Sequence, residues 1–214
     1  MADAYEFLRE RRDVSPMTLA ELSEGLKVSP TRACQVGFDI ETFSPLGFPR
    51  ECEDPVVNAT LALCPYGSLR EGLVLVSLVF PPSSENVLLR QLHHALASIK
   101  DGCLLTYNGT KFDIRYTIQR GRLCGVDFES VFEDLPHLDL YNVARRSRID
   151  FPCYSQKIVE NHLGIRRVVE DLSGASYHRF FLDFMDKGDP RAIFYNIEDS
   201  LGCLRILKAL KQLF

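Results

Sequence analysis

Three strand-like segments precede the first long helical segment, and this order restricts the folds open to the chain more than any other feature. They are rich in β-branched and other apolar residues and occupy residues 34–42, 56–64 and 73–80. A helical segment, a short apolar segment closed by an Asn-Gly turn and a second helical segment follow, at residues 83–102, 103–107 and 110–121. The order predicts a mixed β-sheet with helices on both of its faces.

Two helices carry apolar residues at helical spacing, which predicts the side of each helix that faces the core. In the helix within residues 83–102, the expected inward residues are Val87, Leu88, Leu92, Leu96 and Ile99. The last helix should begin at Asp189-Pro190, a capping residue followed by a proline in the first turn. Its predicted core face is the stripe of Ile193, Ile197, Leu201 and Leu204.

The first 33 residues differ in composition from the rest and are rich in Glu, Arg, Leu and Ala. They are expected to form a helical appendage (1–33) in front of one domain (34–214). The stretch MTLAELSEGLKVSP has features of the first helix of a helix-turn-helix, but a strand follows where a recognition helix is required. Packing against the domain is therefore the preferred role, and a DNA-reading arm is the alternative.

Composition excludes some classes of protein. The chain of 214 residues is 46% hydrophobic, enough for one well-packed core, but no apolar run approaches the roughly 18 residues that span a bilayer. The seven cysteines are widely spaced without a CxxC pair, which favours reduced thiols in a cytoplasmic protein over disulfides or a zinc site. The net charge of −4 indicates neither binding nor exclusion of nucleic acid.

The first strand carries two acids in an otherwise apolar run, VGFDIETFSPLG. Side chains two residues apart in a strand point to the same face, so Asp39 and Glu41 should stand side by side while Phe38 and Ile40 point the other way. Two half-buried like charges are costly unless a cation lies between them. This segment therefore predicts a metal site.

Three later segments also place acids in unusual company. Asp113 follows a strand and a tight turn in TYNGTKFDIRY, Asp139 lies in a short apolar run, and Tyr195 and Asp199 are four residues apart in the last helix, roughly opposite its predicted core face. Each has a structural alternative. Asp113 could close a capping box with Thr110, Asp139 is expected to be structural, and Tyr195 and Asp199 could be an ordinary surface pair, with Glu198 an easy residue to mistake for the ligand.

The segments FDIET, YNGTKFD and YNIED resemble, in order and spacing, the three motifs of the DEDD superfamily of 3′–5′ exonucleases. The resemblance covers about residues 34–214. FDIETFSPLGFPRECEDPVV is similar to the first exonuclease motif of family B DNA polymerases, and QKIVENHLGIRR before YNIEDSLGCL is similar to free-standing exonucleases. Tyr195 and Phe194 place the chain in the tyrosine branch. The resemblance implies a ribonuclease H-like fold, with three antiparallel strands followed by parallel strands.

The resemblance also implies the chemistry of the site. Two Mg²⁺ or Mn²⁺ ions per active site are expected from a ligand set made only of carboxylates. Asp39 would bridge both ions, Glu41 and Asp199 would complete the ion on the nucleophile side, and Asp113 would hold the second through water. Tyr195 would orient the attacking water, since a phenol with a pKa near 10 is a poor base at neutral pH.

The implied substrate is single-stranded DNA, with RNA as an alternative. Candidate substrate contacts are Asn108, Lys111, Arg145 and Arg146. Further basic residues could track phosphates or form solvated surface, and these are Arg115, Arg148, Lys157, Arg166 and Arg167. Phe112 is expected in the core. A homo-oligomer is expected, because a domain of this size has little surface with which to hold a strand. The competing interpretation is a nucleic-acid-binding module of the same fold with weak or no turnover.

Overall fold

The computed structural model describes residues 34–49, 52–65, 72–99 and 102–213. The helical appendage and the DNA-reading arm predicted for residues 1–33 lie outside the described residues.

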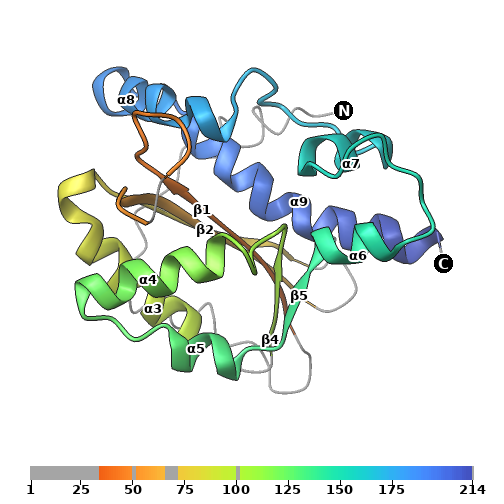
Figure 1. Ribbon diagram of the computed structural model, residues 1–214, viewed down its shortest axis with the longest axis horizontal. Helices are drawn as coiled ribbons and strands as arrows, with labels where there is room; N and C mark the ends of the chain where they lie inside the picture. Colours follow the sequence, from red (N-terminus) through yellow and green to blue (C-terminus); the bar gives the residue numbers. More distant parts are fainter. Residues whose placement is uncertain (1–33, 50–51, 66–71, 100–101, 214) are drawn as a thin grey trace.

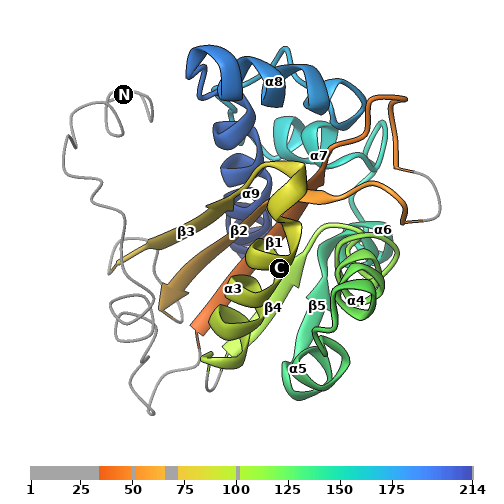
Figure 2. The same cartoon turned by 90° about the vertical axis from the view of Figure 1, so that its left-hand side faces the viewer.

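A five-stranded mixed sheet forms the middle of the domain (Figure 2). Its order is β3-β2-β1-β4-β5, and its strands are β1 (Cys34–Thr42), β2 (Val56–Pro65), β3 (Val74–Val79), β4 (Gly102–Thr106) and β5 (His137–Asp139). β1 pairs antiparallel with β2, and β2 pairs antiparallel with β3. β4 is parallel to β1, and β5 is parallel to β4. The predicted order of antiparallel strands followed by parallel strands is confirmed.

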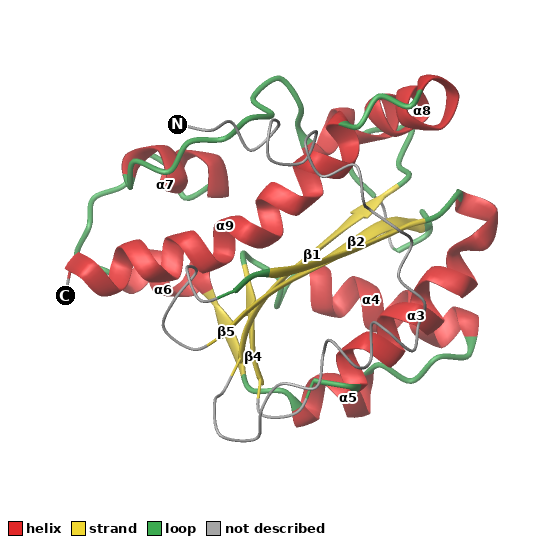
Figure 3. Ribbon diagram, turned by 180° about the vertical axis from the view of Figure 1, so that it is seen from behind, coloured by secondary structure: helices red, strands yellow, loops and turns green. Residues whose placement is uncertain are grey.

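Helices cover both faces of this sheet, as predicted (Figures 1 and 3). One face packs against α3 (Glu85–Ala97), α4 (Asp113–Cys124) and α5 (Glu129–Asp134). The other packs against α9 (Arg191–Leu213), with α6 (Leu140–Arg146), α7 (Gln156–His162) and α8 (Tyr177–Lys187) around it. Two 3₁₀ turns, Pro82–Ser84 and Gly174–Ser176, precede α3 and α8. None of the described helices combines the length and the apolar character needed to cross a membrane.

The alternation along β1 separates the apolar core from the acids. Val36, Phe38 and Ile40 are buried at 2% exposure or less in the cluster with α3 and α4. Asp39 and Glu41 have the opposite parity and point to the α9 face. The expected division of this strand is confirmed.

Gly37 lets α9 lie directly on β1. A Cβ atom at this position would come within 2.0 Å of the carbonyl oxygen of Ser200, so any larger residue would push the helix away. The Ser200 hydroxyl also donates to the carbonyl oxygen of Thr60 at 3.1 Å, which ties the helix to β2. This contact places the helical turn before Ser200 over the carboxyl end of β1.

The predicted core face of the last helix was wrong. Ile193, Ile197 and Leu201 are only half-buried, although Leu204 is buried. The sheet instead receives small and polar residues in the first half of α9 and apolar residues in the second, namely Asn196, Ser200, Cys203, Ile206, Leu207 and Leu210. Close approach to the strand selects small side chains, and a search for large apolar residues misses that face.

The prediction that Val87 of α3 faces the core was also wrong. Val87 is 40% exposed, whereas Leu89 is fully buried beside Leu88 and Leu92. The other expected inward residues, Leu96 and Ile99, are buried as predicted.

Candidate active site

Three carboxylates meet where α9 crosses the carboxyl end of β1. One oxygen from each of Asp39, Glu41 and Asp199 lies within 4.8 Å of the others. The strand supplies two of these side chains from one face, and the Gly37 contact brings the third down from the helix. Sequence positions about 160 residues apart thus form one acidic cluster, at the place that the motifs predicted.

Asp113 approaches the cluster from the gap between two parallel strands. β4 pairs with β1 only as far as Gly37 and Leu105, so the strands separate before Ile40. Asp113 begins α4 beside this gap, and its Oδ1 accepts the Ile40 backbone N–H at 3.2 Å. The alternative capping box with Thr110 is not formed, because α4 has no side-chain cap. Asp113 therefore belongs to the acidic site, although it is not one of the three acids grouped within 4.8 Å.

Burial and mutual repulsion dominate the electrostatics of these acids. Burial is the largest cause of a raised pKa at Asp39, Glu41, Asp113 and Asp199. Repulsion between carboxylates adds to the rise at Asp39, Glu41 and Asp113, whereas Arg167 and Lys157 lower the pKa of Asp199. The pKa of Asp113 rises to about 7. Oxygen ligands held in this way suit a hard divalent cation, whose charge would offset the repulsion. The donor set therefore fits the predicted metal site.

Tyr195 lies on α9 one turn before Asp199. Its side chain is 8% exposed and lines the pocket described below. Burial and then the charge of Asp199 raise the pKa of its hydroxyl above the usual range, while a hydrogen bond from that hydroxyl lowers the pKa of Asp199. The phenol is therefore a neutral hydrogen-bond donor, which agrees with a positioning role and not with that of a base.

Two further acids near the cluster, Glu198 on α9 and Asp139 at the end of β5, have structural partners. Glu198 accepts the backbone N–H groups of Val168 and Val169 at 2.6 and 3.0 Å, so it fixes the loop before α8 and takes no part in the cluster. Asp139 is structural, as expected, because it caps α6 through the Tyr141 N–H and also accepts the N–H groups of Asn108 and Thr110. The contacts of Glu198 with the loop distinguish it from the adjacent Asp199, which belongs to the acidic cluster.

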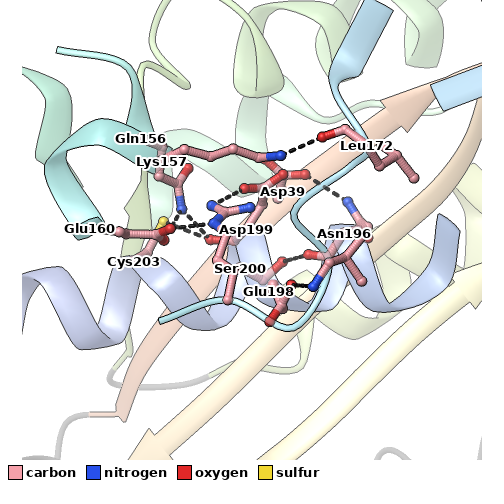
Figure 4. Close-up of polar contacts among 12 residues, drawn as sticks. Asp39, Gln156, Lys157, Glu160, Leu172, Asn196, Glu198, Asp199, Ser200 and Cys203 are labelled. Atoms are coloured by element: carbon pink, nitrogen blue, oxygen red, sulfur yellow. Dashed lines mark hydrogen bonds and ion pairs between the residues drawn. The ribbon is translucent and has the colours of Figure 1, made fainter. Parts of the chain in front are cut away.

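Several polar contacts to the acids were not predicted from the sequence (Figure 4). The Asn196 amide donates to Asp39 Oδ2 at 2.7 Å, and the Gln156 amide donates to the backbone carbonyl of Asp199 at 2.8 Å. Arg167 pairs with Asp199 at 2.5 Å and with Glu160. Asn196 stands inside the YNIED motif, so its position next to Tyr195 was an available signal. Nothing in the local sequence marked Glu160.

A pocket of about 520 Å³ opens over the acidic cluster. Six of its nineteen lining residues are aromatic, namely Phe48, Tyr107, Phe112, Tyr141, Tyr154 and Tyr195. Phe112 also packs against Tyr116 and the core, so the prediction of a core residue is correct only in part. The predicted contact Asn108 lines the pocket in a left-handed turn with φ of 64°.

The predicted basic residues occupy different places around this pocket. Lys111 and Arg145 do not line it, but both are exposed beside the lining residue Tyr141, 6.0 and 5.9 Å from the centre of its ring. Lys111 also lines a neighbouring hollow of about 410 Å³ together with Arg115. Arg146 lies in a separate hollow of about 270 Å³, next to His137.

Arg167 and Lys157 are not surface residues that could track phosphates freely. The Arg167 side chain is 6% exposed. Lys157 lines the pocket, lies 4.9 Å from the centre of the Tyr195 ring and donates to the carbonyl of Leu172. For Arg167, the expectation of a phosphate-tracking residue was wrong.

A model of the RNase H superfamily matches residues 58–211. The chain belongs to the RNase H superfamily. The predicted ribonuclease H-like fold is thereby confirmed. The matched segment contains Asp113, Tyr195 and Asp199, whereas Asp39 and Glu41 precede it.

Solved structures of two kinds of protein resemble this chain. The family B DNA polymerase from the hyperthermophilic archaeon Pyrobaculum calidifontis matches with a TM-score of 0.67 and 20% identity, over 86% of this chain and 25% of the polymerase. E. coli exonuclease I in complex with a dT13 oligonucleotide matches with a TM-score of 0.51 and 14% identity, over 76% of this chain and 43% of the other. A product-bound structure of exonuclease I matches with a TM-score of 0.51 and 16% identity, over 77% of this chain and 46% of the other.

This chain thus spans about a quarter of the polymerase and less than half of exonuclease I, and identities of this size show a shared fold alone. No curated protein matches the chain.

Proposed function

We propose that the protein is a metal-dependent 3′–5′ exonuclease that acts on single-stranded nucleic acid, with DNA as the favoured substrate. The observation that carries this proposal is the cluster of Asp39, Glu41 and Asp199, with Asp113 and Tyr195 beside it, at the base of an aromatic pocket. The similarity to exonuclease I, whose structures include a complex with a dT13 oligonucleotide, supports this choice of reaction and substrate.

The four carboxylates of Asp39, Glu41, Asp113 and Asp199 would hold two Mg²⁺ or Mn²⁺ ions. Bound divalent ions would supply a nucleophilic water at neutral pH and offset the charge of the transferring phosphate. The Asn196 amide holds Oδ2 of Asp39 and so fixes the direction in which this carboxylate faces. The backbone N–H of Ile40 fixes Asp113 in the same way.

In this structure the Tyr195 hydroxyl donates to Asp199, and in the reaction it would donate to the attacking water instead and orient it. The raised pKa of this hydroxyl keeps it protonated, so its contribution is position and not proton abstraction. The ring itself packs against the ammonium of Lys157 and against the Tyr177 ring, whose centre is 6.2 Å away. Such packing preserves the direction of the hydroxyl.

The aromatic wall would favour single strands over duplexes. Bases that are not paired can stack on aromatic side chains, whatever their sequence. Lys111 and Arg145 lie over the ring of Tyr141, a lining residue, and would contact backbone phosphates from there. Asn108 would contact the terminal nucleotide. A paired end would have to melt before its last nucleotide could enter a pocket of about 520 Å³.

The competing function is a nucleic-acid-binding module without turnover. The presence of all four acids and Tyr195 in one site argues against it, because binding alone would not require the repulsion among buried carboxylates.

A substrate panel separates these functions. Single-stranded DNA, single-stranded RNA, blunt duplex and DNA with a blocked 3′ end would be incubated with Mn²⁺ or Mg²⁺. We expect mononucleotides from the single strands, with DNA cut faster, slow cutting of the duplex and none of the blocked end. Tight binding of DNA without products, at any concentration of either metal, would favour the binding module.

A further inference from the structure

Arg167 is a buried cation that joins two carboxylates from different helices. Its Nε donates to Glu160 on α7, and its Nη2 donates to Asp199 Oδ1 on α9 at 2.5 Å. The side chains of all three residues are at most 10% exposed. One planar guanidinium therefore fixes the distance between α7 and the last acid of the cluster.

The surrounding chain is built around this contact. Figure 4 shows Gln156 and Glu160 on α7 facing Asp199 on α9. The Gln156 amide donates both to Glu160 Oε1 at 3.1 Å and to the carbonyl of Asp199. Gly202 provides the space, since a Cβ there would lie 2.0 Å from Glu160 Oε1 and 2.6 Å from Gln156 Nε2.

The loop that carries Arg167 is held from α9 as well. Glu198 accepts the N–H groups of Val168 and Val169, the two residues that follow Arg167. Adjacent residues of the helix thus have linked tasks, because Glu198 fixes the loop and Asp199 receives the guanidinium that the loop presents. Arg167 is therefore placed toward the acidic cluster and not toward solvent.

The contact has two consequences for Asp199. It holds Oδ1, so the carboxylate cannot rotate freely. It also keeps a positive charge beside a site that would bind divalent cations, and like charges repel.

We propose that Arg167 is a positioning residue whose forked contact fixes the orientation of Asp199 and whose charge limits the affinity of the cluster for divalent cations. This inference rests on the proposed exonuclease function. Two substitutions separate the effect of the positive charge from the effect of the two-donor contact with Glu160 and Asp199. Arg167→Lys keeps the charge but lacks the planar pair of donors that reaches both carboxylates. Arg167→Gln loses the charge.

The background of the neutral variant must avoid an unpaired buried Glu160. The comparison is therefore between Glu160→Gln and the double variant Glu160→Gln/Arg167→Gln, which differ only in the residue at position 167. Isothermal titration of Mn²⁺ into each substrate-free protein measures affinity without reference to activity, and thermal melting checks that each is folded.

We expect the double variant to bind Mn²⁺ about tenfold more tightly than Glu160→Gln, because a repelling charge near the site is gone. At saturating Mn²⁺, the kcat of the double variant on single-stranded DNA should nevertheless be about 10- to 100-fold lower than that of Glu160→Gln, since Asp199 is no longer held. Its KM should change little. Arg167→Lys should bind Mn²⁺ like the wild type and show the same loss of kcat.

If the folded double variant binds Mn²⁺ no more tightly than Glu160→Gln, the charge of Arg167 does not limit metal affinity. If Arg167→Lys keeps the wild-type kcat, the two-donor contact does not orient Asp199 for catalysis. A wild-type protein that binds Mn²⁺ without cutting any substrate refutes the proposed function, while the affinity comparison still tests the charge. A wild-type protein that binds no Mn²⁺ overturns both proposals.

Discussion

Asp113→Asn should stabilise the metal-free protein, in contrast to most substitutions of buried polar residues. The asparagine Oδ1 can still accept the Ile40 N–H, so the contact that orients the side chain survives. The substitution removes a carboxylate that is 3% exposed and close to other acids. Without a bound cation, the charged form of this carboxylate is a source of strain.

The size of the effect follows from the raised pKa of Asp113. A rise from 3.8 to about 7 in the folded state corresponds to about 4 kcal/mol of unfolding free energy. The folded protein keeps a proton that the unfolded chain loses, so wild-type stability falls as pH rises through this window. The variant should therefore gain little at pH 4 and gain fully above pH 7, where about 4 kcal/mol raises the Tm by roughly 8–16 °C.

Thermal melting from pH 4 to pH 8 in a chelating buffer measures this gain. Asp139→Asn is the matched control, because Asp139 accepts three backbone N–H groups and should lose about 1–3 kcal/mol on the same chemical change. Excess Mn²⁺ should reverse the order of the wild type and Asp113→Asn, since only the wild type keeps the full ligand set. A destabilised Asp113→Asn at pH 8 without metal, or a gain that does not depend on pH, would refute the reasoning.

Three further predictions concern the site and the assembly. Tyr195→Phe should lower kcat by roughly 30- to 1,000-fold in steady-state kinetics, with KM little changed, because the loss of one positioned hydrogen bond costs about 2–4 kcal/mol in the transition state. Wild-type turnover would remove Tyr195 from the mechanism. Gly37→Ala should lower the Tm, because its Cβ would collide with the Ser200 carbonyl. The control Gly174→Ala makes only ordinary contacts and should not, so equal melting curves for the two variants would contradict the packing of α9 on β1. Sedimentation at micromolar concentration should show a homo-oligomer, and a 24.3 kDa species alone would exclude it.

The acids could be predicted from the sequence because two regularities locate them. Strand alternation places Asp39 beside Glu41, and the resemblance of YNGTKFD and YNIED to the exonuclease motifs identifies Asp113 and Asp199. The mixed sheet followed from the order of the strand and helix patterns, which the structure reproduces in β1 to β4. Local periodicity and motif order were sufficient for these features.

Other parts depend on contacts between distant segments, which local patterns do not encode. The pairing of Arg167 with Glu160 and Asp199 arises only when α7, α9 and the loop are brought together. The three residues of β5 form a strand only by pairing with β4, and they are too few to show alternation. α5 and α8 were not predicted either, and the six residues of α5 span less than two turns.

The contact face of α9 shows why hydrophobic patterns can mislead near a functional site. Asn196 and Ser200 are fully buried because they bond to Asp39 and to β2, so the helix turns polar residues toward the sheet. The apolar Ile193 and Ile197 are left half-buried. A pattern based on apolar residues assigned the wrong face for this reason.

Digestion of a single-stranded DNA oligonucleotide that carries a different label at each end tests the exonuclease function most directly. With Mg²⁺ or Mn²⁺, the wild type should release the 3′ label first and leave a ladder of 5′-labelled products, and chelator should stop the reaction. Asp199→Asn should be inactive, whereas Glu129→Gln, at an exposed acid on α5 outside the cluster, should retain most of the activity. Release of the 5′ label first, digestion in excess chelator, or wild-type rates in Asp199→Asn would contradict the proposed function.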